Sequence, residues 1–191
     1  MKKLSTQRIT LIALFIVINI VGGHIALLAK LPVYLDTIGT LLGSSFFGPV
    51  GGVVVGILTA LINGTTGDLF SIYYMPSQIV TALVAGLIYR KVSATDVKNI
   101  WWSALIISVP ATIVSSVITV ILFHGITSSG SSTIVQVLHG LGVNQTLSVF
   151  LVQIGTDYLD RLIGVYVVAV VYSVIVSRVH LIQISLYKIK K

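Results

Sequence analysis

The chain has 191 residues, of which 55% are hydrophobic and 9% are charged, and its formal net charge is +7. Soluble domains carry about 25% charged residues, so this composition excludes an ordinary soluble enzyme, a disordered chain and a nucleic-acid module. A mean hydropathy of +1.05 predicts a single integral membrane domain over residues 1–191, because nearly the whole length is needed for membrane spans. The chain has no cysteine, which excludes disulfides and thiolate metal sites.

The first apolar run, residues 9–28, is long enough to cross about 30 Å of hydrocarbon at about 1.5 Å per residue. Lys2, Lys3 and Arg8 precede it, as basic residues do in a signal peptide. No small-residue cleavage site followed by a soluble domain is present, so we expect a retained helix.

The next two runs, residues 35–47 and 50–62, are short for membrane spans and are separated by Gly48 and Pro49. Proline stops a helix and biases the preceding residue away from helical conformation. The pair predicts either two short crossings or a re-entrant hairpin buried in protein. Under both alternatives Asn63 returns to the side of the membrane where Asp36 lies.

Two further spans are predicted at residues 75–89 and 100–123, the second of which begins with a tryptophan pair typical of a membrane interface. A flexible Ser/Gly connection follows, and then a short amphipathic segment over residues 133–141.

The last apolar stretch, residues 147–176, is too long for one plain span and carries Asp157, Asp160 and Arg161. We expect it to break at these charges, with a short helix or kink before a sixth span over residues 159–176. The predicted fold class is therefore an all-α bundle of six transmembrane helices, of which the second and third are short.

The basic residues are distributed unevenly between the two sides of such a bundle. With the N-terminus inside, only Lys30 and Arg161 lie on the outer side. The other ten are predicted to be cytoplasmic: Lys2, Lys3, Arg8, Arg90, Lys91, Lys98, Arg178, Lys188, Lys190 and Lys191. This positive-inside pattern predicts a multi-pass cell-membrane protein with both termini in the cytoplasm. It also favours contact with anionic lipid head groups over nucleic acid.

A small residue recurs at every fourth position of one segment: Gly48, Gly52, Gly56, Ala60 and Gly64. Such a stripe lets another helix approach closely. We favour packing within the chain, and a docking face for a partner subunit is the alternative. No internal repeat is evident, which disfavours an inverted-repeat transporter.

Polar residues gather toward the predicted outer side, where amides, hydroxyls and aromatic rings suit a small, flat, polar ligand. Some of them also have purely structural readings. Asn63 suits a helix C-terminus, Asp36 with Thr37 suits a helix N-terminal cap, and Asp157 with Arg161 suits an i, i+4 ion pair. The tyrosines suit an aromatic belt at the membrane interface.

Evidence for catalysis is sparse in the sequence. The phosphate-binding Gly-Lys-Ser/Thr pattern, a paired-histidine metal motif and a Gly-x-Ser-x-Gly elbow are all missing, and no cofactor or metal is predicted. Asp157 and Asp160 lie three residues apart and could share a proton, so an intramembrane aspartyl enzyme is one alternative. Another is a standalone small transporter that couples ions through Asp157, Asp160 and Arg161.

Four stretches carry a resemblance to a known family: LPVYLDTIGT at 31–40, GPVGGVVVG at 48–56, NGTTGD at 63–68 and TDYLDRL at 156–162. With six hydrophobic segments and basic ends, the chain resembles the substrate-binding S component of energy-coupling factor (ECF) vitamin transporters. The resemblance implies a non-enzymatic subunit that binds a vitamin from outside. It also implies association with a membrane scaffold subunit and two ATPase subunits, and release of the vitamin after the subunit topples in the membrane.

The resemblance places the ligand in the outer half of the bundle. The residues expected to bind it are Tyr34, Asp36, Asn63, Asp68, Tyr74, Gln78, His139, Asn144 and Asp157. A pyridoxine-like or hydroxymethylpyrimidine-like ring would suit these side chains, whereas pantothenate, a carboxylate, would need a cation such as Lys30 or Arg161. In the family an Ala-x-x-x-Ala pair on the first helix contacts the scaffold, and the matching positions here are Ala13 and Val17.

Overall fold

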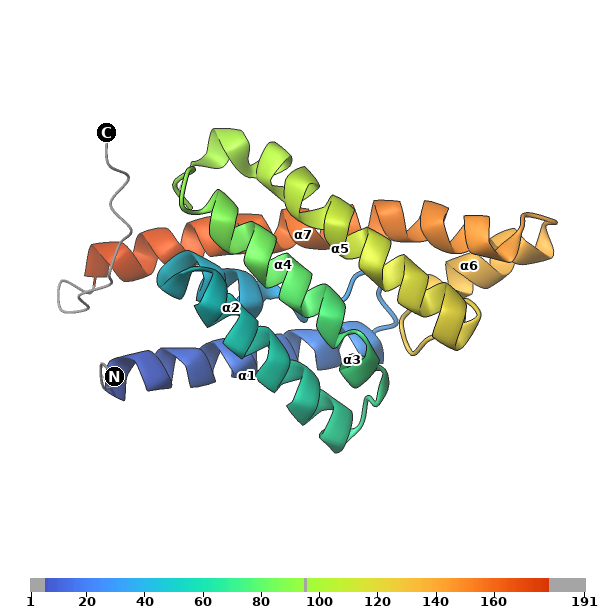
Figure 1. The fold of residues 1–191 in the computed structure, drawn as a ribbon, viewed down its shortest axis with the longest axis horizontal. Coiled ribbons are helices and arrows are strands. Elements are labelled where there is room, and N and C mark those ends of the chain that lie inside the picture. Colours follow the sequence, from blue (N-terminus) through green and yellow to red (C-terminus); the bar gives the residue numbers. More distant parts are fainter. Residues whose placement is uncertain (1–5, 95, 179–191) are drawn as a thin grey trace.

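In the computed structural model, residues 6–94 and 96–178 are described, and they form seven α-helices and one short 3-10 helix, without any strand (Figure 1). The elements in chain order are α1 (Thr6–Leu28), α2 (Ile38–Thr66), α3 (Phe70–Tyr73), α4 (Met75–Ile88), η1 (Val97–Asn99), α5 (Ile100–Phe123), α6 (Ser131–Gly140) and α7 (Gln145–Arg178). The all-α prediction is confirmed. Neither α3 nor η1 was predicted from the sequence.

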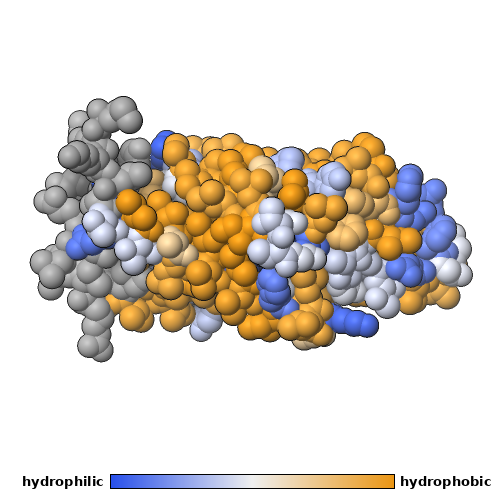
Figure 2. Space-filling view, turned by 90° about the horizontal axis from the view of Figure 1, so that it is seen from below, coloured by the Kyte–Doolittle hydropathy of each residue, from blue (hydrophilic) through white to orange (hydrophobic). Residues whose placement is uncertain are grey.

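By length and composition, α1, α2 and α5 can each cross a membrane, and α4 is a shorter apolar helix. Hydrophobic residues cover most of the face seen in Figure 2, and hydrophilic residues gather at the end where α6 and the start of α7 lie. Large apolar side chains such as Val17, Ile113 and Val170 are exposed on the outside of the bundle. This is the surface expected of a protein whose solvent is lipid.

The start of α1, the connection between α4 and α5, and the end of α7 lie at one end of the bundle (left in Figure 1). The connection carries Lys91 and Lys98, so basic residues gather at this end, as the charge pattern predicted. Of the other basic residues used for that prediction, Lys2, Lys3, Lys188, Lys190 and Lys191 lie outside the described residues. Which side of the membrane this end faces stays a prediction.

The break predicted at Gly48 and Pro49 is confirmed, because α2 consists of two helical arms that meet at Gly48. Gly48 has φ 75° and ψ −172°, a conformation that glycine tolerates, and Pro49 follows it. The arms pack closely, since a Cβ on Gly43 would lie 3.2 Å from the Cα of Gly52. The first arm begins beside Asp36 and the second contains Asn63 near its end, so both residues reach the same part of the molecule.

The small-residue stripe of α2 packs against α4. A Cβ on Gly52 would lie 3.1 Å from the Cβ of Ala82, and one on Gly86 would lie 2.5 Å from the Cα of Pro49. Small residues on both helices therefore bring the two backbones together. Internal packing, the favoured interpretation of the stripe, is confirmed for Gly52.

Asn19 on α1 organises the contact with the first arm of α2. Its side chain is fully buried, and its Oδ1 accepts the backbone N–H of Gly39 at 2.6 Å. Its Nδ2 donates to the hydroxyls of Thr40 and Thr59 at 2.9 and 3.1 Å. Thr37, the N-cap of α2, makes no side-chain capping bond. Asn19 therefore satisfies an N-terminal N–H of α2 from a neighbouring helix.

The break predicted near residue 159 is wrong, because α7 runs without interruption over 34 residues, roughly 50 Å at 1.5 Å per residue. The charged residues that suggested a break are buried against other elements and hydrogen-bonded there. Since their polar groups are satisfied by tertiary contacts, the helix does not need to open at them.

The α1–α2 contact gives a direct test of this packing. A Cβ on Gly39 would lie 1.9 Å from the carbonyl oxygen of Phe15, whereas one on Gly155 of α7 would meet no atom within 4 Å. We expect Gly39→Ala to destabilise the protein by about 1–3 kcal/mol through overpacking. The matched control Gly155→Ala should leave the midpoint of thermal unfolding in detergent unchanged or slightly raised. Equal midpoints for the two variants would contradict this account of the α1–α2 contact.

Candidate functional site

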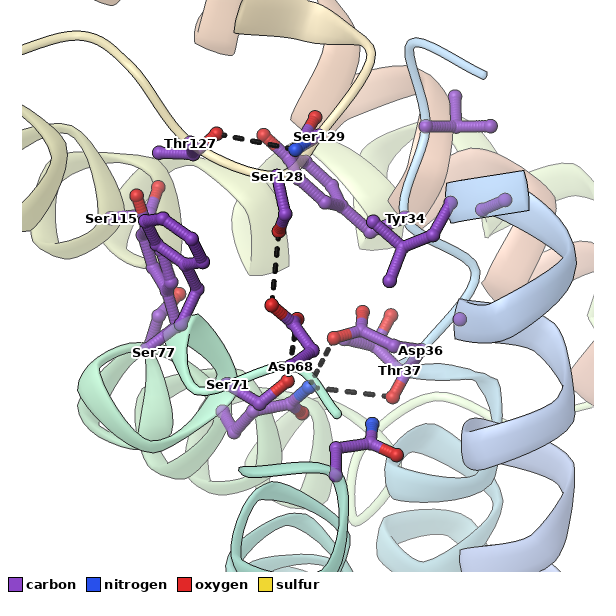
Figure 3. Close-up of a pocket in the computed structure, with 18 of the residues that line it drawn as sticks. Tyr34, Asp36, Thr37, Asp68, Ser71, Ser77, Ser115, Thr127, Ser128 and Ser129 are labelled. Carbon is purple, nitrogen blue, oxygen red and sulfur yellow. Dashed lines mark hydrogen bonds between the residues drawn. The ribbon is translucent and has the colours of Figure 1, made fainter. Parts of the chain in front are cut away.

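A cavity lies between the α1–α2 loop, the end of α2, the segment from α3 to α4, the α5–α6 loop and α7 (Figure 3). Seven of the nine residues predicted to bind a ligand line it: Tyr34, Asp36, Asn63, Asp68, Tyr74, Gln78 and Asp157. They come from segments far apart in the sequence, and the fold brings them to one place.

The other two predicted residues do not line the cavity. His139 lies near the end of α6, exposed, with its Nδ1 3.1 Å from the carbonyl oxygen of Val143. Asn144 precedes α7, and its Oδ1 accepts the backbone N–H of Thr146 at 2.9 Å. That bond is a helix N-terminal cap, which explains an asparagine at this position without a ligand.

Asp160 fastens the α1–α2 loop to α7. Its Oδ1 accepts the backbone N–H groups of Tyr34 and Leu35 at 3.0 and 2.7 Å, and its Oδ2 accepts the Thr37 hydroxyl at 3.2 Å. Leu35 has φ 53°, a left-handed conformation that is costly for a residue with a side chain. The bonds to the buried carboxylate offset that cost and hold Tyr34 and Asp36 at the cavity.

Arg161 also joins α7 to this loop. Its Nη1 lies 2.5 Å from Oδ2 of Asp160 and donates to the Thr37 hydroxyl at 2.6 Å. The predicted i, i+4 pair with Asp157 is therefore wrong. Asp157 instead faces α5, where its Oδ2 accepts hydrogen bonds from Thr112 at 2.8 Å and Ser115 at 3.1 Å.

Asp36 lies in the loop beside Gln78 of α4. The Gln78 amide donates to its Oδ2 at 3.2 Å, and the Thr40 hydroxyl donates to Oε1 of Gln78 at 3.1 Å. Asp36 is partly exposed, but protein surrounds it on most sides. This burial and the nearby negative charge of Asp160 raise the pKa of Asp36 to about 7. The predicted capping role of Asp36 and Thr37 is wrong, since α2 has no side-chain cap there.

Hydrogen bonds cross the cavity between the loops. Asp68, after α2, accepts from Ser71 at 3.0 Å and from Ser128 of the α5–α6 loop at 3.1 Å (Figure 3). The Tyr34 hydroxyl lies 3.1 Å from that of Ser131 at the start of α6. The Ser/Gly segment, predicted as a flexible connection, therefore contributes to the cavity wall.

Tyr74 is oriented from two directions. Its hydroxyl lies 2.6 Å from that of Thr119, and its ring stacks on Phe123 with centroids 5.9 Å apart and an interplanar angle of 29°. The ring is therefore held in place at the cavity wall before any ligand enters.

Two cavity residues carry buried polar atoms that lack a hydrogen-bond partner in the described part of the chain: Oδ1 of Asn63 and Nε of Arg161. Such atoms are few in native proteins, and each calls for an explanation such as a bound molecule. Within the described residues, no group of three or more His, Asp or Glu side chains could hold a metal ion.

The model of the family described as ECF transporter, substrate-specific component, matches residues 7–180. The chain belongs to this family. The predicted resemblance to S components is thus confirmed over nearly the whole length, and the chain is a membrane protein of a transport family. No curated protein and no solved structure matches it.

Several residues of the cavity were not predicted from the sequence, among them Ser77, Ser115 and Ser129. Ser115 had a detectable signal, because Ser108, Thr112, Ser115 and Thr119 recur at helical spacing on one face of an otherwise apolar segment. That pattern predicts a polar face directed toward protein rather than lipid. His24 and Arg161 also line the cavity.

The raised pKa of Asp36 predicts how the stability of the empty S component depends on pH. An unfolded Asp titrates near ~3.9, whereas folded Asp36 titrates at about 7. The folded state therefore binds this proton more tightly, and the resulting stabilisation is complete below about pH 4 and lost as the pH rises through about 7. We therefore expect the thermal unfolding midpoint of ligand-free protein to decrease as the pH is raised from about 5 to about 8.

The isosteric variant Asp36→Asn serves as the control, because it cannot titrate at this position. Its unfolding midpoint should fall less over the same pH range. An identical pH dependence in both proteins would show that Asp36 does not titrate in this range.

Proposed function

We propose that this S component captures a small vitamin or vitamin precursor in the cavity described above and delivers it to an ATP-driven ECF transporter. The family supplies the general role, that of a substrate-binding subunit. The observation that carries the finer proposal is the convergence of seven polar or aromatic side chains, from loops and helices distant in sequence, on one cavity.

The cavity suits a pyridoxine-like or hydroxymethylpyrimidine-like ring better than pantothenate. Tyr34 and Tyr74 offer aromatic surface for stacking, and the amides of Asn63 and Gln78 can form hydrogen bonds with the polar edge of a ligand ring. Pantothenate would need a free cation, but Arg161 is paired with Asp160, and Lys30 does not line the cavity.

Transport would follow from association with partners. In this proposal the chain spans a cell membrane with both termini in the cytoplasm, and the cavity takes its ligand from outside. Association with a membrane scaffold subunit and two ATPase subunits then releases the ligand inside. The sequence has no phosphate-binding motif of its own, which agrees with energy supplied by partner ATPases.

The contacts of the two α7 carboxylates weaken both rival functions. Asp160 accepts hydrogen bonds from the α1–α2 loop and Asp157 accepts them from α5, so the two carboxyl groups are not arranged around a shared proton. This disfavours an intramembrane aspartyl enzyme. The bonds of Asp160 and Arg161 to the loop give both residues a structural role, which disfavours an ion-coupling role in a standalone transporter.

The proposed function is tested by purifying the chain alone and extracting the small molecules that accompany it for mass spectrometry. We expect a stoichiometric vitamin or vitamin precursor. Ion-driven uptake by the isolated chain in liposomes, with no scaffold or ATPase present, would contradict the proposal and favour a standalone transporter.

We further propose that Ala13 and Val17 contact the scaffold. Both are exposed on α1, Val17 by 52%, while Phe15 and Asn19 on the opposite face are buried. Val17→Trp should therefore fold and bind ligand normally but abolish uptake in cells that also produce the scaffold and ATPases, because the larger ring blocks close helix contact.

The control for that variant is Ile113→Trp on α5, a residue that is similarly exposed. It should leave both ligand binding and uptake unchanged. Normal uptake by the Val17→Trp variant would exclude this face of α1 as the docking surface.

A further inference from the structure

We propose that the ligand of this cavity is a small heteroaromatic ring bearing an amino or ammonium group, held between the carboxylates of Asp36 and Asp157. This inference rests on the proposed function and narrows its ligand to one charge class. It follows from the balance of charge at the cavity and from the acceptor atoms that the fold leaves open there.

The charged residues that line the cavity are mainly acidic. Asp36, Asp68 and Asp157 line it together with a single guanidinium, that of Arg161. Nη1 of Arg161 is already paired with Asp160 at 2.5 Å, which leaves its Nε without a partner, and none of the three lining carboxylates forms a salt bridge within the described part of the chain. Carboxylates removed from water are costly unless a cation or hydrogen-bond donors accompany them.

In the described part of the chain, side chains donate to only one carboxylate oxygen of Asp36 and of Asp157. Gln78 donates to Oδ2 of Asp36, and Thr112 and Ser115 both donate to Oδ2 of Asp157. No side chain of the described residues donates to Oδ1 of either carboxylate, although the backbone N–H of Asp36 bonds its own carboxyl group. The side-chain bonds hold the two carboxylates in place from different walls, and the remaining lone pairs can accept hydrogen bonds from a bound molecule or water.

Asp68 differs from these two residues. Both of its oxygens accept hydrogen bonds from serines, Ser71 and Ser128, which leaves it fewer free acceptor sites. The open carboxylate oxygens of the cavity therefore belong to the pair Asp36 and Asp157, and the unpartnered Oδ1 of Asn63 is a further neutral acceptor beside them. N–H groups of a cationic or amino-substituted ring are the donors that carboxylates bind most strongly.

The pKa of Asp36 agrees with a missing cation. Burial and the charge of Asp160 raise it to about 7 against the lowering effect of Arg161, as expected for a carboxylate without a salt-bridge partner of its own. An ammonium or amino group would supply that partner. A ligand carboxylate would add a further negative charge beside three others and would be repelled.

The aromatic lining explains why the cation is expected on a ring. Tyr34, Phe70 and Tyr74 line the cavity, and bonds to Ser131 and Thr119 fix the two tyrosine hydroxyls. Aromatic faces bind both flat rings and cations. A flat ligand ring with a positively charged edge can pack against the aromatic side chains and pair with the carboxylates at the same time.

The experiment uses three probes that share one pyridine ring and differ in charge at one substituent: pyridoxamine, pyridoxine and 4-pyridoxate. Binding to ligand-free full-length protein in detergent is measured by calorimetry. We expect pyridoxamine to bind at least about tenfold more tightly than pyridoxine, as for one added charge-assisted hydrogen bond, and 4-pyridoxate not to bind detectably. Equal or tighter binding of 4-pyridoxate, or no binding of any probe, would overturn the inference.

Two isosteric variants locate the effect. Asp36→Asn and Asp157→Asn should each reduce the preference for pyridoxamine over pyridoxine to less than about threefold, because an amide cannot pair with a cation. The control Asp96→Asn changes a carboxylate in the α4–α5 connection, outside the cavity lining, and should keep the full preference. An unchanged preference in both cavity variants, with normal unfolding midpoints, would also overturn the inference.

The molecule that copurifies with the chain separates this inference from the proposed function. A basic or amino-substituted ring supports both. A carboxylate or phosphate ligand would overturn the charge class but leave the binding role in place, whereas a preparation with neither a bound small molecule nor affinity for any probe would remove both.

Discussion

The buried carboxylate of Asp160 is the interaction on which the site depends. It accepts two backbone N–H groups and a hydroxyl from the α1–α2 loop, and it pairs with Arg161. Its partner Leu35 lies 125 positions away in the sequence and adopts a left-handed conformation. Breaking a buried pair of this kind typically costs about 3–5 kcal/mol. Without it, Tyr34 and Asp36 would lose their attachment to α7, and the cavity would lose a wall.

A second network connects the cavity to the helix packing beneath it. Asp36 accepts from Gln78, Gln78 accepts from Thr40, and Thr40 accepts from Asn19, which also satisfies the N-terminus of α2. Polar groups buried in a membrane protein must find partners within the protein. Here the same bonds that satisfy α2 also position a cavity carboxylate, so the helix packing and the geometry of the cavity depend on shared residues.

Much of the fold was predictable because its signals are local. Apolar runs marked the helices, and Gly48 with Pro49 marked the kink in α2. The continuity of α7 and the choice of Asp160 as the partner of Arg161 were not predictable, because both depend on contacts with distant segments. In the site, the polar residues flanking the spans indicated most of the lining. His139 and Asn144 show the limit of that reasoning, since they flank a span in the sequence but do not line the cavity.

The central claim is that the S component binds its ligand where these loops meet α7. The most direct test is an experimental structure of the purified chain with the small molecule that accompanies it. We predict ligand density in contact with Asp36 and Asp157, beneath the α1–α2 loop held by Asp160. Density at any other place, with this cavity empty, would contradict the account.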